Sequence, residues 1–122
     1  WIAMVLAQAS PVILLDEPTN HLDIAHALDV LALVRRLGAQ DGKTVVVVLH
    51  DLNLAARFAD DIVFFRAGKV AGCGAVEDVF RQNLIEDVFG IECIVRQEPA
   101  SGRPFCIPLA ACPTRRDRPE QD

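Results

Sequence analysis

A chain of 122 residues has room for one domain with one modest hydrophobic core. Its content of 52% hydrophobic and 24% charged residues is that of an ordinary globular protein and excludes a largely disordered one. The formal net charge of -5 argues against nonspecific binding to nucleic acid, which depends on Lys and Arg side chains that meet phosphates.

The apolar segments and the cysteines narrow the class of protein further. The longest apolar stretches, WIAMVLA and VVVVL, are far shorter than the roughly 20 residues that a membrane-spanning helix needs. The four cysteines form no C-x-x-C pair and have no histidine at metal-ligand spacing. This pattern favours reduced thiols in a cytosolic protein over a disulfide framework or a structural zinc site.

The first predicted elements are a helix and a strand. Residues 1–8 (WIAMVLAQ) have the pattern of a helix that ends near Pro11. The run VILLD at residues 12–16 is apolar without polar alternation, which predicts a strand buried on both faces of a parallel sheet. Pro18 prevents this strand from continuing, and the loop PTNHLD follows.

A second helix is predicted from about Asp23. Apolar side chains recur at helical spacing over residues 24–34, so that one face of the helix is apolar. Arg35 and Arg36 suit the carboxyl end of this helix, and the segment 38–42, which begins and ends with glycine, is expected to close it.

The stretch KTVVVVLHD repeats the form of the first strand. It predicts a β-branched strand that ends at His50, followed by a helix from about Asp51 (LNLAARFA). Alternation of strands and helices is typical of an α/β fold with a parallel sheet. Ligands of such sheets bind at the carboxyl ends of the strands, so Asp16, Glu17 and His50 are expected to lie side by side.

The remaining elements are predicted from shorter patterns. The run DIVFFRAGKVAGCG indicates two strands around a tight A-G-K turn, and helical pieces are expected at about 75–81 and 83–89. IECIVRQ and PFCIPLA predict two further strands around PASGR. The last residues, 113–122, have the composition of a disordered tail.

The adjacent carboxylates of Asp16 and Glu17 are the first candidates for chemistry. On an extended chain they point to opposite sides, so one can hold a hydrated Mg²⁺ while the other orients a water. The alternative is that they only solvate the strand end or cap the next helix. The four apolar residues before the pair and the polar loop after it favour the first interpretation.

The three histidines are further candidates for chemistry, and each also suits an ordinary structural role. His50 follows an apolar strand and opens a helix, where it is suited to bind a phosphate or a catalytic water, or else is fixed by local hydrogen bonds. His21 lies in the loop, and His26 lies early in a helix where surface exposure is expected. Both are weaker candidates.

At this point two stretches carry a resemblance to a known family. VILLDEPTNHLD, followed by VVVVLHDLNLAARFADDIVFFRAGKV, resembles the carboxyl-terminal half of an ABC-transporter ATP-binding subunit. HDLNLAARFADDI and the tail with VFG and SGRPFC resemble the iron-siderophore, haem and cobalamin importer branch. The implied fold is a partial P-loop NTPase sheet with helices, in which VILLD with Glu17 is the Walker B strand.

The resemblance also implies roles for individual residues. Asp16 would coordinate Mg²⁺ through water, and Glu17 would act as general base on the attacking water. His50 would be the switch histidine that contacts the γ-phosphate of ATP and the attacking water. The D-loop, which would cross the interface between two ATPase subunits, consists of Asn20, His21, Leu22 and Asp23.

The implied protein hydrolyses ATP to power import of a ferric siderophore or a related metal chelate. Its cofactors would be ATP and Mg²⁺. Its partners would be a second ATPase subunit in a homodimer, transmembrane permease subunits and, indirectly, a periplasmic or surface solute-binding protein. No nucleic-acid partner is expected, and the location would be peripheral, at the cytoplasmic face of the cell membrane.

Departures from the family pattern limit this expectation. The chain contains no G-x-x-x-x-G-K-[ST] and no L-S-G-G-Q, and it opens on Trp1 with Met4 as its only methionine. We therefore expect a cut chain that is inactive by itself. Residues 1–91 would belong to the shared ATPase domain, 92–112 to family-specific strands and 113–122 to the tail.

Two alternatives remain open from the sequence. The first is a non-catalytic remnant, because nothing within the chain excludes that origin. The string DEPTNHLD is also favoured by ABC-type cytosolic translation factors, although these usually continue with an H-D-R-x-F-L pattern that is absent here.

Overall fold

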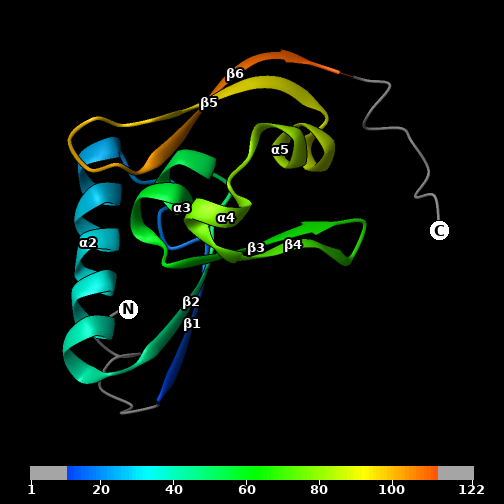
Figure 1. The fold of residues 1–122 in the computed structure, drawn as a ribbon. Coiled ribbons are helices and arrows are strands. Elements are labelled where there is room, and N and C mark those ends of the chain that lie inside the picture. Colours follow the sequence, from blue (N-terminus) through cyan, green and yellow to red (C-terminus); the bar gives the residue numbers. More distant parts are fainter. Residues whose placement is uncertain (1–10, 113–122) are drawn as a thin grey trace. The chain divides into compact units, whose positions relative to one another are not determined.

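The computed structural model describes residues 11–112. The chain divides into two compact units, with the boundary between Asp51 and Leu52 (Figure 1). The helix predicted at residues 1–8 and the disordered tail predicted at 113–122 lie outside the described residues.

The first unit is a strand–helix–strand arrangement. It contains β1 (Val12–Asp16), α2 (Ile24–Asp41) and β2 (Thr44–Val48). The two strands pair in parallel, with Leu14 opposite Val46 and Asp16 opposite Val48. Helix α2 connects them and runs alongside the pair (Figure 1). The predicted α/β fold with parallel strands is therefore confirmed.

Burial of β1 differs from the prediction. Ile13 and Leu15 are buried and pack with Val34 of α2, but Val12 and Leu14 on the other face are 54% and 68% exposed. The prediction that the strand is buried on both faces is wrong, because α2 covers one face of the strand pair only.

The carboxyl end of α2 also differs from the prediction. The helix passes through Gly38 and ends at Asp41, and Gly42 adopts the left-handed conformation (φ 61°) that commonly terminates helices. A Cβ atom on Gly38 would make ordinary van der Waals contact with Cγ2 of Val45 at 3.4 Å, so Gly38 lies on the side of α2 that faces β2. Consequently Arg35 and Arg36 do not lie in the last turn.

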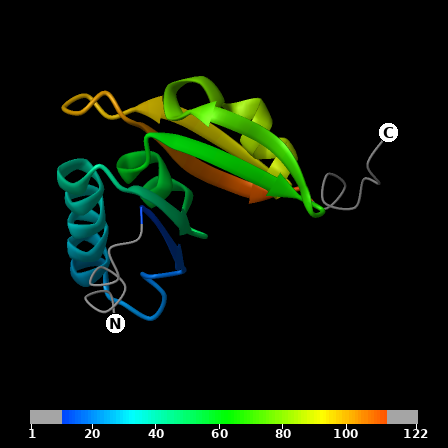
Figure 2. The same ribbon diagram turned by 90° about the horizontal axis from the view of Figure 1, so that it is seen from below.

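The second unit begins with α3 (Leu52–Phe58) and contains two antiparallel hairpins (Figure 2). The remaining elements are β3 (Asp61–Arg66), β4 (Lys69–Ala75), α4 (Val76–Val79), α5 (Gln82–Phe89), β5 (Ile91–Gln97) and β6 (Pro104–Ala111). The strands and helices predicted for this part of the sequence are confirmed. Positive φ angles of 50° and 76° at Ala67 and Gly68 close the first hairpin in the predicted tight turn.

The core of the second unit joins both hairpins to all three helices. Its most buried side chains include Ala56 of α3, Phe64 of β3, Val76 of α4, Ile85 of α5 and the thiols of β5 and β6. The four cysteines are free thiols, with Cys93 and Cys106 buried. None of the helices between residues 11 and 112 combines the length and apolar character that a membrane span requires.

Candidate functional site

The carboxyl ends of β1 and β2 form the candidate site. Asp16 ends β1 opposite Val48, and the next amide, that of Glu17, donates a hydrogen bond of 2.9 Å to the Val48 carbonyl. The parallel ladder thus extends one residue beyond β1. Because of this pairing, the residues that follow the two strands lie at the same edge of the sheet.

Glu17 leaves the extended conformation of the strand. Its φ is 49°, in the left-handed region that non-glycine residues rarely adopt. The prediction that Asp16 and Glu17 point to opposite sides of an extended chain therefore does not hold at Glu17. Asp16 is exposed, whereas the side chain of Glu17 is only 34% exposed.

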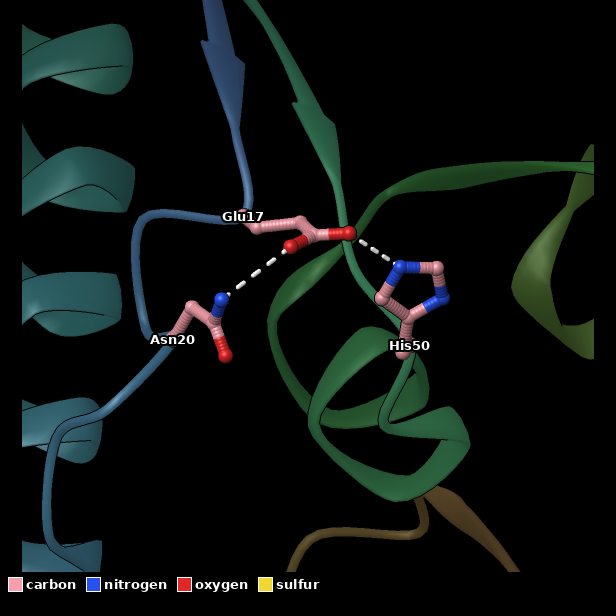
Figure 3. A network of polar contacts seen from close by, with 3 residues as sticks. All are labelled: Glu17, Asn20 and His50. Atoms are coloured by element: carbon pink, nitrogen blue, oxygen red, sulfur yellow. Dashed lines mark hydrogen bonds and ion pairs between the residues drawn. The ribbon is translucent and has the colours of Figure 1, made fainter.

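The carboxylate of Glu17 contacts the imidazole of His50 (Figure 3). Oε1 of Glu17 meets Nε2 of His50 across 33 positions of sequence. The His50 side chain is 80% exposed, so most of its ring faces solvent. The expectation that the two strand ends bring these residues together is confirmed.

Asn20 contacts the second oxygen of the same carboxylate. Its Nδ2 donates to Oε2 of Glu17 at 3.3 Å, and its backbone amide donates to the Glu17 carbonyl at 3.0 Å (Figure 3). Sequence reasoning assigned Asn20 to the D-loop and missed this contact. The available signal was the spacing of three residues across a loop that contains Pro18, which is typical of a turn.

The rest of the predicted D-loop faces solvent. His21 has a φ of 65°, and Leu22 is 41% exposed. Asp23 is the amino-terminal cap of α2: its Oδ1 accepts a hydrogen bond of 2.8 Å from the backbone amide of His26, and Nδ1 of His26 lies 2.8 Å from the same oxygen. His26 is exposed, as predicted.

This arrangement is suited to activating a water molecule next to an anionic ligand. A carboxylate held on both oxygens is a fixed proton acceptor, and an exposed imidazole beside it can bind an anion or a water. Within residues 11–112 no group of three or more His, Cys, Asp or Glu side chains is placed to hold a metal ion. Asp16 offers one exposed carboxylate, which fits a hydrated Mg²⁺ that takes its other ligands from waters and phosphates.

The known proteins that resemble this chain are named as ATP-binding proteins of transport and import systems. No family model matches the chain. The chain is 44% identical over 109 residues to the ferric enterobactin transport ATP-binding protein FepC of Escherichia coli (strain K12). This alignment covers 89% of this chain and 40% of FepC. It is 50% identical over 106 residues to the hemin import ATP-binding protein HmuV of Rhodopseudomonas palustris (strain ATCC BAA-98 / CGA009). This alignment covers 86% of this chain and 39% of HmuV.

A solved structure matches the fold. A structure described as a metal-chelate type ABC transporter in an inward-facing conformation superposes with a TM-score of 0.80 and 25% identity. The match covers 88% of this chain and 44% of that one. The chain spans about 40% of the length of the curated relatives named above. Over most of its length the chain is therefore related to part of the ATP-binding subunits of ABC importers for siderophores and hemin.

Proposed function

We propose that this chain is part of an ATPase that hydrolyses ATP to power import of a ferric siderophore or a related metal chelate. The observation that carries the proposal is the contact between Glu17 and His50 at two adjacent strand ends. The names of the relatives support the importer branch. The activity is assigned to a longer protein, because the chain spans only about 40% of those relatives.

In the proposed mechanism Glu17 is the general base. Its carboxylate accepts the proton of a water molecule as that water attacks the γ-phosphate of ATP. The contacts from His50 and Asn20 to its two oxygens support this role, because they hold the carboxylate in one orientation. His50 is proposed to bind the γ-phosphate and the attacking water through its exposed ring.

Asp16 is proposed to hold Mg²⁺ through a water molecule. When bound, Mg²⁺ would neutralise charge on the transferred phosphoryl group. The chemistry of the exposed Asp16 carboxylate fits this ion, because Mg²⁺ is commonly held by one or two carboxylates together with substrate phosphates. The residues described here would supply only this part of the magnesium site.

The exposed loop at Asn20, His21, Leu22 and Asp23 is proposed to meet a second ATPase subunit. Its exposure supports this, because side chains that cross an interface must be accessible in the separate chain. We also propose permease subunits as partners, an indirect link to a solute-binding protein and a location at the cytoplasmic face of the membrane. Residues 1–91 would then form the shared ATPase part and residues 92–112 a branch-specific addition.

The test uses the complete reading frame that contains this chain, with release of inorganic phosphate from ATP as the measurement. We expect Glu17→Gln to lower kcat by about 10²–10⁴-fold with little change in KM, since loss of a general base typically has that effect. Glu77→Gln, at an exposed position of α4, is the matched control and should retain full turnover.

Two results would overturn the proposal. If the complete protein releases no phosphate from ATP, the ATPase function is wrong. If Glu17→Gln leaves kcat unchanged, the role of Glu17 is wrong. The 122-residue chain alone is expected to release no phosphate, because it contains no glycine-rich loop to hold the β- and γ-phosphates.

A further inference from the structure

The loop after β1 opens with a turn that brings Asn20 back beside Glu17. The Asn20 amide donates to the Glu17 carbonyl at 3.0 Å, which is the bond between the first and fourth residues of a β-turn. Pro18 occupies the second position, where its fixed φ favours such a turn. A second bond of this kind, from the Leu22 amide to the Thr19 carbonyl at 3.2 Å, follows directly. The backbone of the loop therefore fixes where the side chain of Asn20 begins.

The side chain of Asn20 holds one oxygen of the Glu17 carboxylate. Its Nδ2 donates to Oε2 at 3.3 Å, while Nε2 of His50 contacts Oε1 (Figure 3). The carbonyl oxygen of Asn20 lies on the far side of its amide group (Figure 3). This orientation agrees with the chemistry, because an ionised carboxylate accepts hydrogen bonds and would repel the carbonyl oxygen. All three residues belong to the first unit.

Two contacts on different oxygens restrict the carboxylate more than one contact does. The last torsion of a glutamate side chain is broad, so a carboxylate held on one oxygen still turns about that bond. The hydrogen bond from Asn20 to the second oxygen opposes this rotation. Each carboxylate oxygen accepts more than one hydrogen bond, and both therefore remain able to accept from a water.

Asn20 also lies in the loop that is proposed to meet a second ATPase subunit. Asn20 is exposed, but its amide group is bound to Glu17 of the same chain. Asp23 of the same loop likewise binds its own chain, because its carboxylate caps α2 at the His26 amide. Two side chains of this loop thus serve the chain that carries them.

We propose that Asn20 is a positioning residue for the general base Glu17 of its own chain. The Asn20 amide holds Oε2 and His50 contacts Oε1, so that the carboxylate keeps one orientation towards the attacking water. Asn20 touches neither ATP nor the water in this arrangement and acts through Glu17 alone. The inference rests on the proposed function, in which Glu17 is the general base.

The first test measures phosphate release by the complete protein. We expect Asn20→Ala to lower kcat about tenfold and to leave KM for ATP within about twofold, because orientation of the base is lost while ATP binding is kept. Asn20→Asp keeps a residue type that turns favour but replaces the donor by a second carboxylate, so kcat should fall at least as far. Asn83→Ala, at an exposed position of α5, is the matched control and should retain full turnover.

A double-mutant cycle separates positioning from a general effect on the loop. A positioning residue acts only through the group it positions, so Asn20→Ala should not lower kcat further in the Glu17→Gln protein. An equal loss in both backgrounds would overturn the proposal, and so would unchanged kcat in Asn20→Asp. An interface role predicts instead that the loss disappears as protein concentration rises, because mass action restores the dimer. That result would also overturn the proposal.

The second test needs no ATP hydrolysis. In the 122-residue chain, the ¹⁵N resonance of Nε2 in His50 reports on its contact with Oε1 of Glu17. We expect this resonance to move in Asn20→Ala towards its position in Glu17→Gln and to stay in place in Asn83→Ala. An unmoved resonance in Asn20→Ala would overturn the positioning role. A moved resonance in a protein whose complete form releases no phosphate would refute the proposed function but keep the hold of Asn20 on Glu17, so the two failures are distinguishable.

Discussion

The backbone of Glu17 explains why two adjacent carboxylates lie in different surroundings. Asp16 ends β1 and is exposed, whereas Glu17 has a φ of 49° and a half-buried side chain. Such a conformation costs on the order of 1–3 kcal/mol for a non-glycine residue and persists only where its surroundings impose it. The hydrogen bonds between Glu17 and Val48 and between Asn20 and Glu17 supply that constraint.

Asp23 carries a prediction at the same scale. Its carboxylate caps α2 by accepting from the His26 amide. We expect Asp23→Ala to lower the free energy of unfolding of the first unit by about 1 kcal/mol, the usual cost of a lost amino-terminal cap, and Asp23→Asn to be nearly neutral. Urea titration that follows the α2 amides by hydrogen exchange measures this.

Asp29→Ala is the matched control for Asp23→Ala. Asp29 lies on the exposed face of α2, where alanine is the better helix former. This control should therefore be neutral or slightly stabilising. A loss in Asp23→Ala no larger than that in Asp29→Ala would contradict the role of Asp23 as a cap.

At the scale of elements, periodic patterns were sufficient for the order of strands and helices. The apolar spacing before Val34 predicted α2, and the β-branched run predicted β2. The contact of Glu17 with His50 could be anticipated, because parallel neighbours end at one edge of a sheet. The left-handed conformation of Glu17 could not be anticipated, because it depends on the hydrogen bond from the Glu17 amide to the Val48 carbonyl of β2.

Two errors of the sequence reasoning have one physical cause. The run VILLD shows that its residues are apolar but not which elements cover them, and Leu14 is exposed in the structure. Gly38 is a residue type that often ends helices, yet α2 continues through it to Asp41 and ends at Gly42. In both cases the residue type alone does not specify the surroundings, because α2 covers only one face of β1 and a helix tolerates a glycine in its interior.

The β5–β6 hairpin carries a prediction on pH. The hydrogen bond from the Ser101 side chain, followed by those from the amides of Ala100 and Ser101 and by the charge of Arg57, lowers the pKa of Glu98 below its usual 4.5. Because the pKa is lowered in the folded state, this carboxylate stabilises the loop fully above pH 4.5 and loses the effect as pH falls through the lowered pKa.

An NMR titration of the Ala100 and Ser101 amides measures this pKa. We expect a midpoint below 4.5 in the wild-type chain and no such transition in Glu98→Gln. Exchange of the two amides should also be faster in Glu98→Gln at neutral pH, since the neutral amide is a weaker acceptor than the carboxylate. Glu77→Gln is the control, and a midpoint at or above 4.5 would contradict the role of Glu98 in the loop.

At the scale of the whole molecule, the first unit leaves an apolar sheet face uncovered. Val12 and Leu14 of β1 lie opposite Thr44 and Val46 of β2, and Val12, Leu14 and Val46 are 54%, 68% and 47% exposed. Val48 extends the face and is 42% exposed. Contiguous apolar surface of this kind favours association, because burying it removes apolar area from water.

The uncovered face therefore predicts that the 122-residue chain associates at rising concentration and that Leu14→Lys weakens the association. Sedimentation velocity over a concentration series measures the effect. Ile24→Lys is the matched control, since Ile24 of α2 is 80% exposed and lies outside the sheet face. Each added lysine brings the net charge closer to zero from -5, which by itself reduces repulsion between chains. Weaker association in Leu14→Lys alone thus identifies the apolar face as its cause, whereas equal weakening in both variants, or a monomeric wild-type chain at every concentration, would refute it.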